Sequence, residues 1–497
     1  MKHLAAKIVF GAFWSSAGRI TLTLISLLST VILARFLLPA DFGLVAIAMS
    51  VAALLDVLST LGFDMWLIKE NEPTRDSYNT AWTMNSIRGF VLGAALSLCS
   101  LYSSLLFDDP RCRSVFLVMA AIQVIEGVKN IGIVNFRKEL DFKKEFNFNL
   151  ISKLASFSAT IISVHILSDY RALLIGMLAG AISHFILSFI LSAYRPAWCL
   201  RDWRRMITFS KWLLANNVLL YINRRLVTVI IGTILPTRSV GLYTVSSEIG
   251  KTPTTELVWP LTRVLFPSFS KIKQEKNLLR DSYLKSLSVI TLIGTPLGLG
   301  LSAVSAPLVS LCLGPAWDDA GPLVAYIAAF GILSLNWAGS NGIYLALDRP
   351  QIQTKILAFS AIWRLPLLLF FVPENGAIGA AVAMGIADVI LLIANWYAVG
   401  LLLRFDIGDL IKHIWRPWSS AAIMWLGVFQ IETYVINSFG ANNPLALLML
   451  LTLSGALIYS VLLFALWVVS GRPKGGETTF LQCLKLFKEN TINRADL

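Results

Sequence analysis

Charged residues are scarce in this sequence: only 14% of its 497 residues are Asp, Glu, Lys or Arg, whereas 56% are hydrophobic. Soluble domains carry about 25% charged residues, because their surfaces face water. A chain of this length could form roughly three soluble domains of about 150 residues each. It has too few charged residues for the water-exposed surfaces of such domains. The composition therefore excludes a soluble enzyme and a disordered protein, and it favours a chain surrounded by lipid.

Cysteine is also rare, and it is not patterned. The five cysteines are odd in number and show no C-x-x-C spacing, which excludes a disulfide-stapled secreted fold and a cysteine metal site. The motifs H-E-x-x-H and G-x-S-x-G are missing as well. The sequence therefore predicts no catalytic residue, no metal and no cofactor.

Long apolar runs dominate what is present. Val9–Phe36 and Leu445–Val469 each exceed the roughly 18 residues that cross a bilayer as a helix. The first run is too long for the apolar core of a signal peptide and is expected to remain as a span. We therefore expect an all-α polytopic membrane protein with about fourteen transmembrane helices. The expected spans are 9–37, 42–68, 78–106, 114–136, 148–168, 172–193, 213–235, 240–263, 286–313, 319–347, 356–372, 376–403, 417–437 and 443–470.

Basic residues are distributed unevenly between the two sides of these spans. With the N-terminus inside, the inner connections hold 28 Lys and Arg, whereas the outer loops hold only Arg111, Arg113, Arg171 and Arg238. Cytoplasmic loops carry the excess of Lys and Arg in membrane proteins. Both termini are therefore expected in the cytoplasm. The same asymmetry explains the net charge of +13 without a nucleic-acid partner.

The chain resembles itself at an offset of 198 residues. Thr30–Ile32 matches Thr228–Ile230. After a one-residue slip Leu38-Pro39 matches Leu235-Pro236, and Gly43 then matches Gly241, so that proline and glycine bracket an equivalent turn. Chance similarity between apolar helices is the alternative, but parallel repeats are typical of transporters that rock two halves around a cavity. The predicted organisation is a six-helix lobe 1–195, an amphipathic linker helix 196–212, a six-helix lobe 213–405, helices thirteen and fourteen in 406–470, and a cytoplasmic tail 471–497.

Two inner loops, 136–146 and 201–212, alternate aromatic and basic residues at helical spacing. Such segments are expected to lie in the inner headgroup layer as surface helices. For 201–212, which joins the two lobes, a simple linker is an equal alternative.

Ten basic residues fall inside the expected spans, where a charge costs about 2.5–3.5 kcal/mol. The deepest indicate a cationic cavity that suits an anionic cargo, because guanidinium groups bind phosphate oxygens in a bidentate manner. Arg224 and Arg225 point about 100° apart on a helix, so a structural role for one of them stays open. The candidate substrate-binding residues are Arg19, Arg88, Arg224, Arg225, Lys251 and Arg364.

Acidic residues also lie inside the spans. Glu126 and Glu248 each precede a lysine by three residues, which predicts structural ion pairs with Lys129 and Lys251. His184 lies in mid-span; a hydrogen-bonded core histidine is the simpler reading than a titrating one. Three acids have no basic residue three or four positions away and are the candidate ion-coupling residues, although partners on other helices stay open: Asp56, Glu256 and Asp388.

Several short segments give the chain a family resemblance over about residues 5–410. They are Arg35–Leu44 (RFLLPADFGL), Phe136–Phe142 (FRKELDF), Val240–Tyr243 (VGLY), Arg263–Phe269 (RVLFPSF) and Leu313–Trp317 (LGPAW). With these segments the chain resembles the Wzx-like polysaccharide and oligosaccharide-lipid flippases of the multidrug/oligosaccharidyl-lipid/polysaccharide exporter superfamily.

The resemblance implies a function and a place. It implies two six-helix lobes plus a terminal pair of helices in the bacterial inner membrane. The implied cargo is an undecaprenyl-pyrophosphate-linked oligosaccharide for exopolysaccharide or O-antigen (lipopolysaccharide) assembly, moved from the inner to the outer leaflet by alternating access. Membrane lipids, a glycan polymerase and other export proteins are the implied partners.

Two other functions remain compatible with the sequence. A drug or cation exporter of the same superfamily would need an acidic, aromatic cavity, which the deep arginines disfavour. A polytopic glycan polymerase or ligase would need a sizeable outer loop, and the longest expected one runs only from 107 to 113. Gly250–Thr252 resembles the end of a phosphate-binding loop, but Val245 stands where that loop needs glycine, so no nucleotide-binding site is expected. The expected energy source for transport is therefore an ion gradient or consumption of the product outside.

Overall fold

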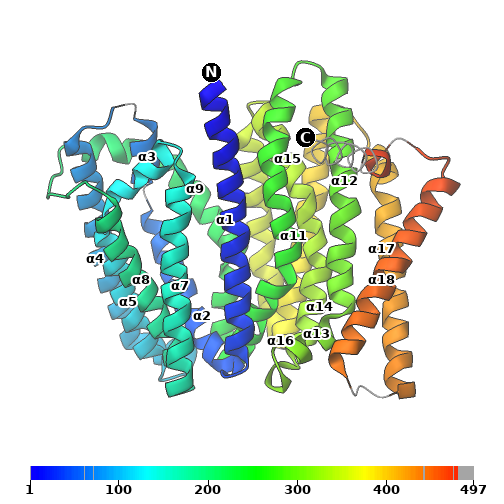
Figure 1. The fold of residues 1–497 in the computed structure, drawn as a ribbon, viewed down its shortest axis with the longest axis horizontal. Coiled ribbons are helices and arrows are strands. Elements are labelled where there is room, and N and C mark those ends of the chain that lie inside the picture. Colours follow the sequence, from blue (N-terminus) through cyan, green and yellow to red (C-terminus); the bar gives the residue numbers. More distant parts are fainter. Residues whose placement is uncertain (1, 61, 71, 440–442, 474, 480–497) are drawn as a thin grey trace, which may run out of the picture. The chain divides into compact units, whose positions relative to one another are not determined.

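The computed structural model describes residues 2–60, 62–70, 72–439, 443–473 and 475–479, with the backbone alone for 2–13, 207–216, 224, 257–264, 338 and 439. The described residues form helices and contain no strand (Figure 1). They divide into two compact units, an N-terminal unit Met1–Val245 and a C-terminal unit Ser246–Leu497. The predicted all-α fold class is confirmed. These two units are defined by compactness, whereas the predicted lobes are defined by the internal repeat. The lobe boundaries therefore stay a prediction.

The N-terminal unit is built mainly from pairs of long helices: α4 packs along α5, α7 along α8, and α1 along α7. Its helices are α1 (Lys2–Ala34), α2 (Pro39–Ser59), α3 (Phe63–Lys69), α4 (Arg75–Phe107), α5 (Cys112–Val128), η1 (Ile131–Val134), α6 (Asn135–Lys138), α7 (Phe142–Leu167), α8 (Arg171–Leu191), α9 (Trp203–Arg224) and α10 (Leu226–Ile234).

The next helix, α11, begins in the N-terminal unit and continues into the C-terminal unit. In the C-terminal unit α12 packs along α17, and α17 packs along α18. The helices from here on are α11 (Thr237–Lys271), α12 (Lys276–Ala303), α13 (Ser305–Cys312), η2 (Pro315–Trp317), α14 (Ala320–Gly331), η3 (Ile332–Ser334), α15 (Leu335–Ala346), α16 (Pro350–Leu403), α17 (Ile407–Phe439) and α18 (Pro444–Val469).

Ten helices in the described part are long and apolar enough to cross a membrane, or up to twelve if two bent pairs each count as one span. One of the ten, α16, has 54 residues and turns back on itself at Gly376, whose φ of 59° and ψ of −140° are not helical. It contains the two expected spans 356–372 and 376–403. The chain is therefore a multi-pass membrane protein, and the number fourteen stays a prediction.

Local sequence explains where many helices begin and end. The Thr74 side chain accepts a hydrogen bond from the Ser77 amide at the start of α4, and Asp141 does the same for Lys144 at the start of α7. Such caps satisfy amide groups that the first turn leaves free. Because Leu140 has a positive φ and Asp141 caps the start of α7, the expected surface helix 136–146 is divided between α6 and α7. The expected helix at 201–212 forms the first part of α9 from Trp203 onward.

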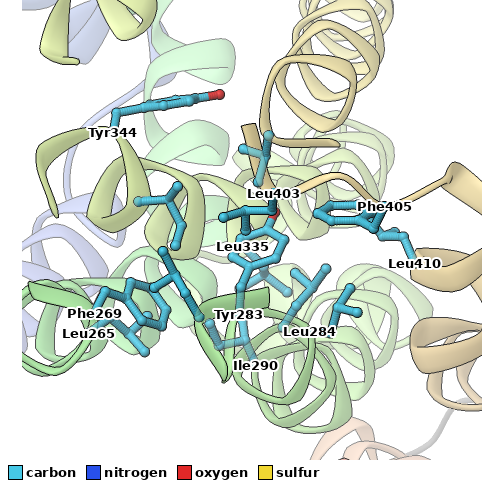
Figure 2. Close-up of a cluster of buried hydrophobic side chains, with 14 of the residues drawn as sticks. Leu265, Phe269, Tyr283, Leu284, Ile290, Leu335, Tyr344, Leu403, Phe405 and Leu410 are labelled. Atoms are coloured by element: carbon cyan, nitrogen blue, oxygen red, sulfur yellow. The ribbon is translucent and has the colours of Figure 1, made fainter. Parts of the chain in front are cut away.

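Large apolar side chains cover the outside of the long helices. On α18, Leu453 is 71% and Leu457 66% exposed, whereas Leu451 is fully buried. Exposed leucine is stable where lipid tails replace water. Inside the C-terminal unit, Tyr283 lies among leucines beside Phe405, as Figure 2 shows, and its hydroxyl lies 3.1 Å from Ser340 Oγ.

The expected tail at 471–497 includes a short docked segment. The carboxylate of Glu477 lies 2.9 Å from Arg416 Nε of α17, and the exposed side-chain fractions are 6% and 5%. The Gly476 amide donates to Ser288 Oγ of α12 at 3.0 Å. A side chain on Gly476 would clash with the backbone of Ser288, which explains the glycine here.

Gly43 and Gly241, which the internal repeat pairs, lie against each other where the first turns of α2 and α11 cross. Each is the fifth residue of its helix. A Cβ on Gly43 would overlap the Thr237 carbonyl oxygen, and a Cβ on Gly241 would overlap that of Pro39. Only glycine at both positions allows the two helices to approach this closely.

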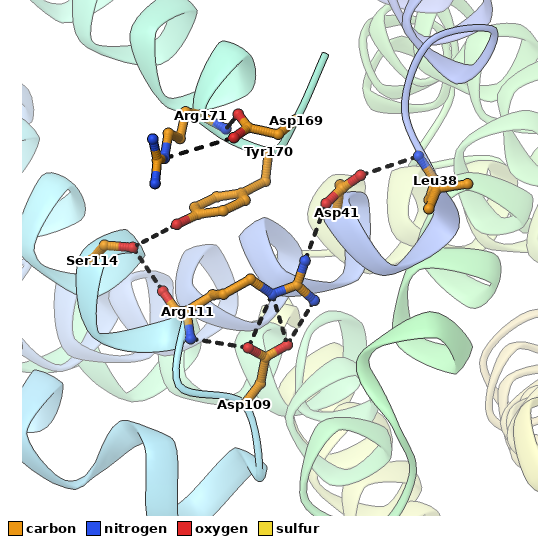
Figure 3. Close-up of polar contacts among 8 residues, drawn as sticks. All are labelled: Leu38, Asp41, Asp109, Arg111, Ser114, Asp169, Tyr170 and Arg171. Atoms are coloured by element: carbon orange, nitrogen blue, oxygen red, sulfur yellow. Dashed lines mark hydrogen bonds and ion pairs between the residues drawn. The ribbon is translucent and has the colours of Figure 1, made fainter. Parts of the chain in front are cut away.

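A polar cluster ties together the loops at the same end of the N-terminal unit (Figure 3). Arg111 Nη2 lies 2.8 Å from Asp109 Oδ2, and Arg111 Nη1 lies 3.4 Å from Asp41 of α2. The Arg111 guanidinium also lies over the ring of Tyr170, which precedes α8. Burial acts to raise the pKa of Asp109, but hydrogen bonds from the side chain and amide of Arg111 outweigh it and hold that pKa below 3.8.

Candidate functional site

Arg88 and Asp56 form an ion pair between α4 and α2. Arg88 Nη2 lies 2.5 Å from Asp56 Oδ1, and the side chains are 26% and 39% exposed. Arg88 Nη1 also reaches Thr60 Oγ1 at 3.5 Å, at the end of α2. A predicted substrate-binding cation and a predicted coupling acid are thus brought together from two helices.

A second pair of the same kind lies within α16. Arg364 Nη2 is 2.5 Å from Asp388 Oδ1, and the arginine side chain is only 5% exposed. Arg364 Nε donates to Ser360 Oγ at 3.2 Å, and Nη1 lies 3.3 Å from the Met384 sulfur. Since the pair is held in a largely buried environment, its attraction is stronger than that of a surface pair.

Arg225 lies at a break in a predicted span. The segments Asn217–Asn223 and Leu226–Ile234 are bent by 47°, and Arg225 stands between them with an exposed side chain. It forms no ion pair with the side chains that the structure describes. The side chain of Arg224 lies outside the described residues, so its predicted role stays a prediction.

The other predicted site residues lie on α1 and α11. Arg19, Lys251 and Glu256 are each half-buried and interact with neighbouring residues. Arg19 lies on α1, and Lys251 and Glu256 lie on α11. Their predicted functions remain predictions.

Glu126 and His184 are not among the site residues that the sequence predicts. Lys129 Nζ lies 2.7 Å from Glu126 Oε2, which confirms the predicted ion pair. The other oxygen, Oε1, lies 3.1 Å from His184 Nδ1 of α8. Because α5 and α8 are far apart in sequence, no local spacing could reveal this contact.

A polar cavity of about 140 Å³ lies beside this group in the N-terminal unit. Its charged and titratable lining residues are Asp64, Glu126, Lys129, Arg137, Glu145 and His184. Within the residues described, no group of three or more His, Cys, Asp or Glu side chains could hold a metal ion.

Long apolar helices that contain ion pairs and are broken at polar residues are typical of transporters. The class is a polytopic membrane transport protein. A family model described as polysaccharide biosynthesis protein matches residues 32–322, more than half of the chain, and the chain belongs to this family.

Curated relatives match most of the chain. It is 26% identical over 422 residues to the lipopolysaccharide biosynthesis protein WzxC of Escherichia coli (strain K12), with 84% of this chain and 85% of that protein covered. It is 21% identical over 450 residues to the succinoglycan biosynthesis transport protein ExoT of Rhizobium meliloti (strain 1021), with 87% of each covered. The predicted family resemblance is confirmed.

Solved structures of transporters share the fold. The lipid II flippase MurJ, in an inward closed conformation, matches with a TM-score of 0.73 and 15% identity over 93% of this chain and 100% of that one. An inward-facing MATE family multidrug resistance transporter of the MOP superfamily matches with a TM-score of 0.55 and 14% identity, over 80% and 99% of the chains. Family, relatives and fold together show a membrane transport protein of polysaccharide biosynthesis, not an enzyme.

Proposed function

We propose that this protein flips an oligosaccharide repeat unit, linked to undecaprenyl pyrophosphate, from the inner to the outer leaflet for exopolysaccharide or O-antigen assembly. The observation that carries the proposal is the fold of a lipid flippase over 93% of a chain that belongs to a polysaccharide biosynthesis family. The proposed location is the bacterial inner membrane, with both termini in the cytoplasm. Partners at the outer face are a glycan polymerase and other export proteins.

The two arginine–aspartate pairs suggest how an anionic cargo is handled. A pyrophosphate offers several oxygens to a guanidinium group, so it competes with Asp56 for Arg88 and with Asp388 for Arg364. A carboxylate that loses its arginine binds a proton or a sodium ion more readily. Cargo binding and ion binding are then thermodynamically linked at the same pair.

The other predicted residues complete this scheme. Arg19, Arg224, Arg225 and Lys251 supply further positive charge for the pyrophosphate, and Glu256 is a third coupling acid. Only an ion that binds one conformation more tightly than the other biases the transport cycle. Alternating access through a cationic central cavity moves the cargo.

Reconstituted liposomes test cargo and mechanism together. They contain a fluorescent polyprenyl-pyrophosphate glycan, and a membrane-impermeant quencher reports its transfer. Arg88→Ala and Arg364→Ala are expected to lower the flipping rate at least tenfold. Arg201→Ala removes an exposed arginine that pairs with Asp76 and serves as the matched control with the parent's rate. Equal rates in all variants contradict the cationic cavity.

The coupling acids are tested with imposed proton and sodium gradients in the same liposomes. Asp56→Asn, Asp388→Asn and Glu256→Gln are compared with the parent. Each is expected to reduce the acceleration that a gradient produces. If flipping is equal with and without a gradient in the parent, consumption of the product outside is the driving force instead.

Reporter fusions test the orientation. A reporter after Leu497 or within 196–210 is expected in the cytoplasm, and reporters near Asp108 or Ala441 are expected outside. A C-terminus on the outer side contradicts the even number of spans that the two-lobe arrangement requires.

A further inference from the structure

The span that begins with α5 is broken near one end. In the orientation predicted from the distribution of Lys and Arg, this is the cytoplasmic end. Cys112–Val128 and Ile131–Lys138 are bent by 70° at Lys129 and Asn130. Asn130 is fully buried, and its amide donates to Ser188 Oγ at 2.9 Å. Its side chain donates to the Tyr194 carbonyl at 2.7 Å and accepts from the Gly132 amide at 2.9 Å. The break is therefore a well-bonded feature, and broken helices of transporters commonly bind ions or substrate.

The backbone carbonyl groups in the last turn of α5 accept hydrogen bonds from side chains of α4. Trp82 Nε1 donates to the Val128 carbonyl at 3.1 Å, and Ser86 Oγ lies 3.4 Å from that of Gly127. A helix C-terminus stabilises positive charge placed beside it. Lys129 and His184 both occupy this position, because both contact Glu126 in the last turn of α5.

The ring of His184 is oriented by two neighbours. Phe148 of α7 stacks on it with ring centres 5.0 Å apart and an angle of 10° between the planes. Glu126 receives Lys129 on Oε2 and the imidazole on Oε1. An ionised carboxylate only accepts hydrogen bonds, so Nδ1 of His184 carries the hydrogen and Nε2 is the nitrogen left to bind a proton.

The charged residues that line the cavity carry one more negative charge than positive charges while His184 is neutral. Asp64 of α3, Glu126 of α5 and Glu145 of α7 contribute three negative charges, whereas Lys129 and Arg137 contribute two positive ones. Arg137 Nε pairs with Glu145 Oε1 at 2.6 Å. Asn85 of α4 and Asn149 of α7 are the neutral polar residues that face the same space. A protonated His184 balances the third carboxylate.

We propose that Glu126 and His184 form a proton-binding site at the broken helix. A proton from water adds to Nε2 of His184, and the Nδ1–H bond to Glu126 becomes an ion pair. Since a cavity of about 140 Å³ has room for several waters, the proton has a route to the ring. Protonation strengthens the link between α5 and α8, and deprotonation weakens it. This inference rests on the proposed transport function for its consequence, but not for its chemistry.

Histidine ring NMR in lipid nanodiscs tests the chemistry without transport. The chain has four histidines, so His184→Gln assigns one signal by its loss. That signal is expected to shift as the pH is lowered, because the ring then gains a proton at Nε2. Glu126→Gln is expected to change this response, because the protonated ring loses its counter-charge. A His184 signal that does not titrate, or that ignores Glu126→Gln, overturns the proposal.

The liposome assay tests the consequence for transport. Flipping by the parent is expected to change several-fold between pH 5.5 and 8, and His184→Gln is expected to abolish this dependence. His165→Gln changes an exposed histidine beside Phe36, outside the cavity, and is the matched control that retains it. An unchanged pH profile in His184→Gln overturns the coupling role. Absence of flipping in the parent at every pH instead contradicts the proposed function, and the NMR titration still decides the proton site.

Discussion

Arg364 and Asp388 lie twelve residues before and twelve residues after Gly376, and their side chains meet at 2.5 Å. In a straight helix, 24 residues span about 36 Å. The ion pair therefore exists only because α16 turns back at Gly376.

Removing one partner of this pair is expected to destabilise the protein. Asp388→Asn leaves a guanidinium that is 5% exposed without its counter-charge, which costs about 3 kcal/mol for a largely buried pair. Arg364→Ala/Asp388→Ala is expected to lose less than the sum of the single variants. Thermal unfolding in detergent measures Asp388→Asn, the single variants Arg364→Ala and Asp388→Ala, and the double variant. Additive losses contradict a direct interaction.

The backbone at Gly376 predicts a second effect. Its φ of 59° and ψ of −140° are accessible to glycine, and nothing lies within 4 Å of the place where a Cβ would stand. Gly376→Ala is therefore expected to cost about 1–3 kcal/mol through backbone strain alone. Gly408→Ala is the matched control, since its Cβ also meets open space and its φ is negative. Similar melting temperatures for both variants contradict a strained turn.

The loop cluster around Arg111 predicts a pH dependence. Hydrogen bonds from Arg111 hold the pKa of Asp109 below 3.8 in the folded protein. The resulting stabilisation is fully present above pH 3.8 and is lost as the pH falls through the folded value. Asp109→Asn is therefore expected to lower the melting temperature at pH 7 by the equivalent of up to about 1 kcal/mol, since Arg111 is 40% exposed. The difference from the parent should disappear in strong acid; a constant difference argues for a steric effect.

The crossing of α2 and α11 predicts a steric effect at either glycine. Gly43→Ala places a methyl group against the backbone of Thr237 and Gly241, so the two helix ends must separate. The expected cost is about 1–3 kcal/mol, as for an overpacked core. Gly300→Ala is the control, because its Cβ meets only Met424 at 3.8 Å. Melting temperatures of the two variants, measured together, decide whether close approach matters.

Much of the molecule follows from local patterns. Apolar runs of sufficient length predict the helices, since a helix satisfies all its backbone hydrogen bonds within one segment in lipid. The spacing of Glu126 and Lys129 by three residues predicts their ion pair, because one turn of helix places them side by side. Caps such as Thr74 and Asp141 likewise act over three residues.

The partners of Asp56, Asp388 and His184 were decided by tertiary structure. Asp56 meets Arg88 from another helix, Asp388 meets Arg364 across a reversal of the chain, and His184 meets Glu126 from 58 residues away. Helical periodicity relates residues within one or two turns, and it carries no information on which helices become neighbours or in what register. The sequence by itself therefore determined the membrane fold and the supply of charges, and packing of distant helices decided which charges meet.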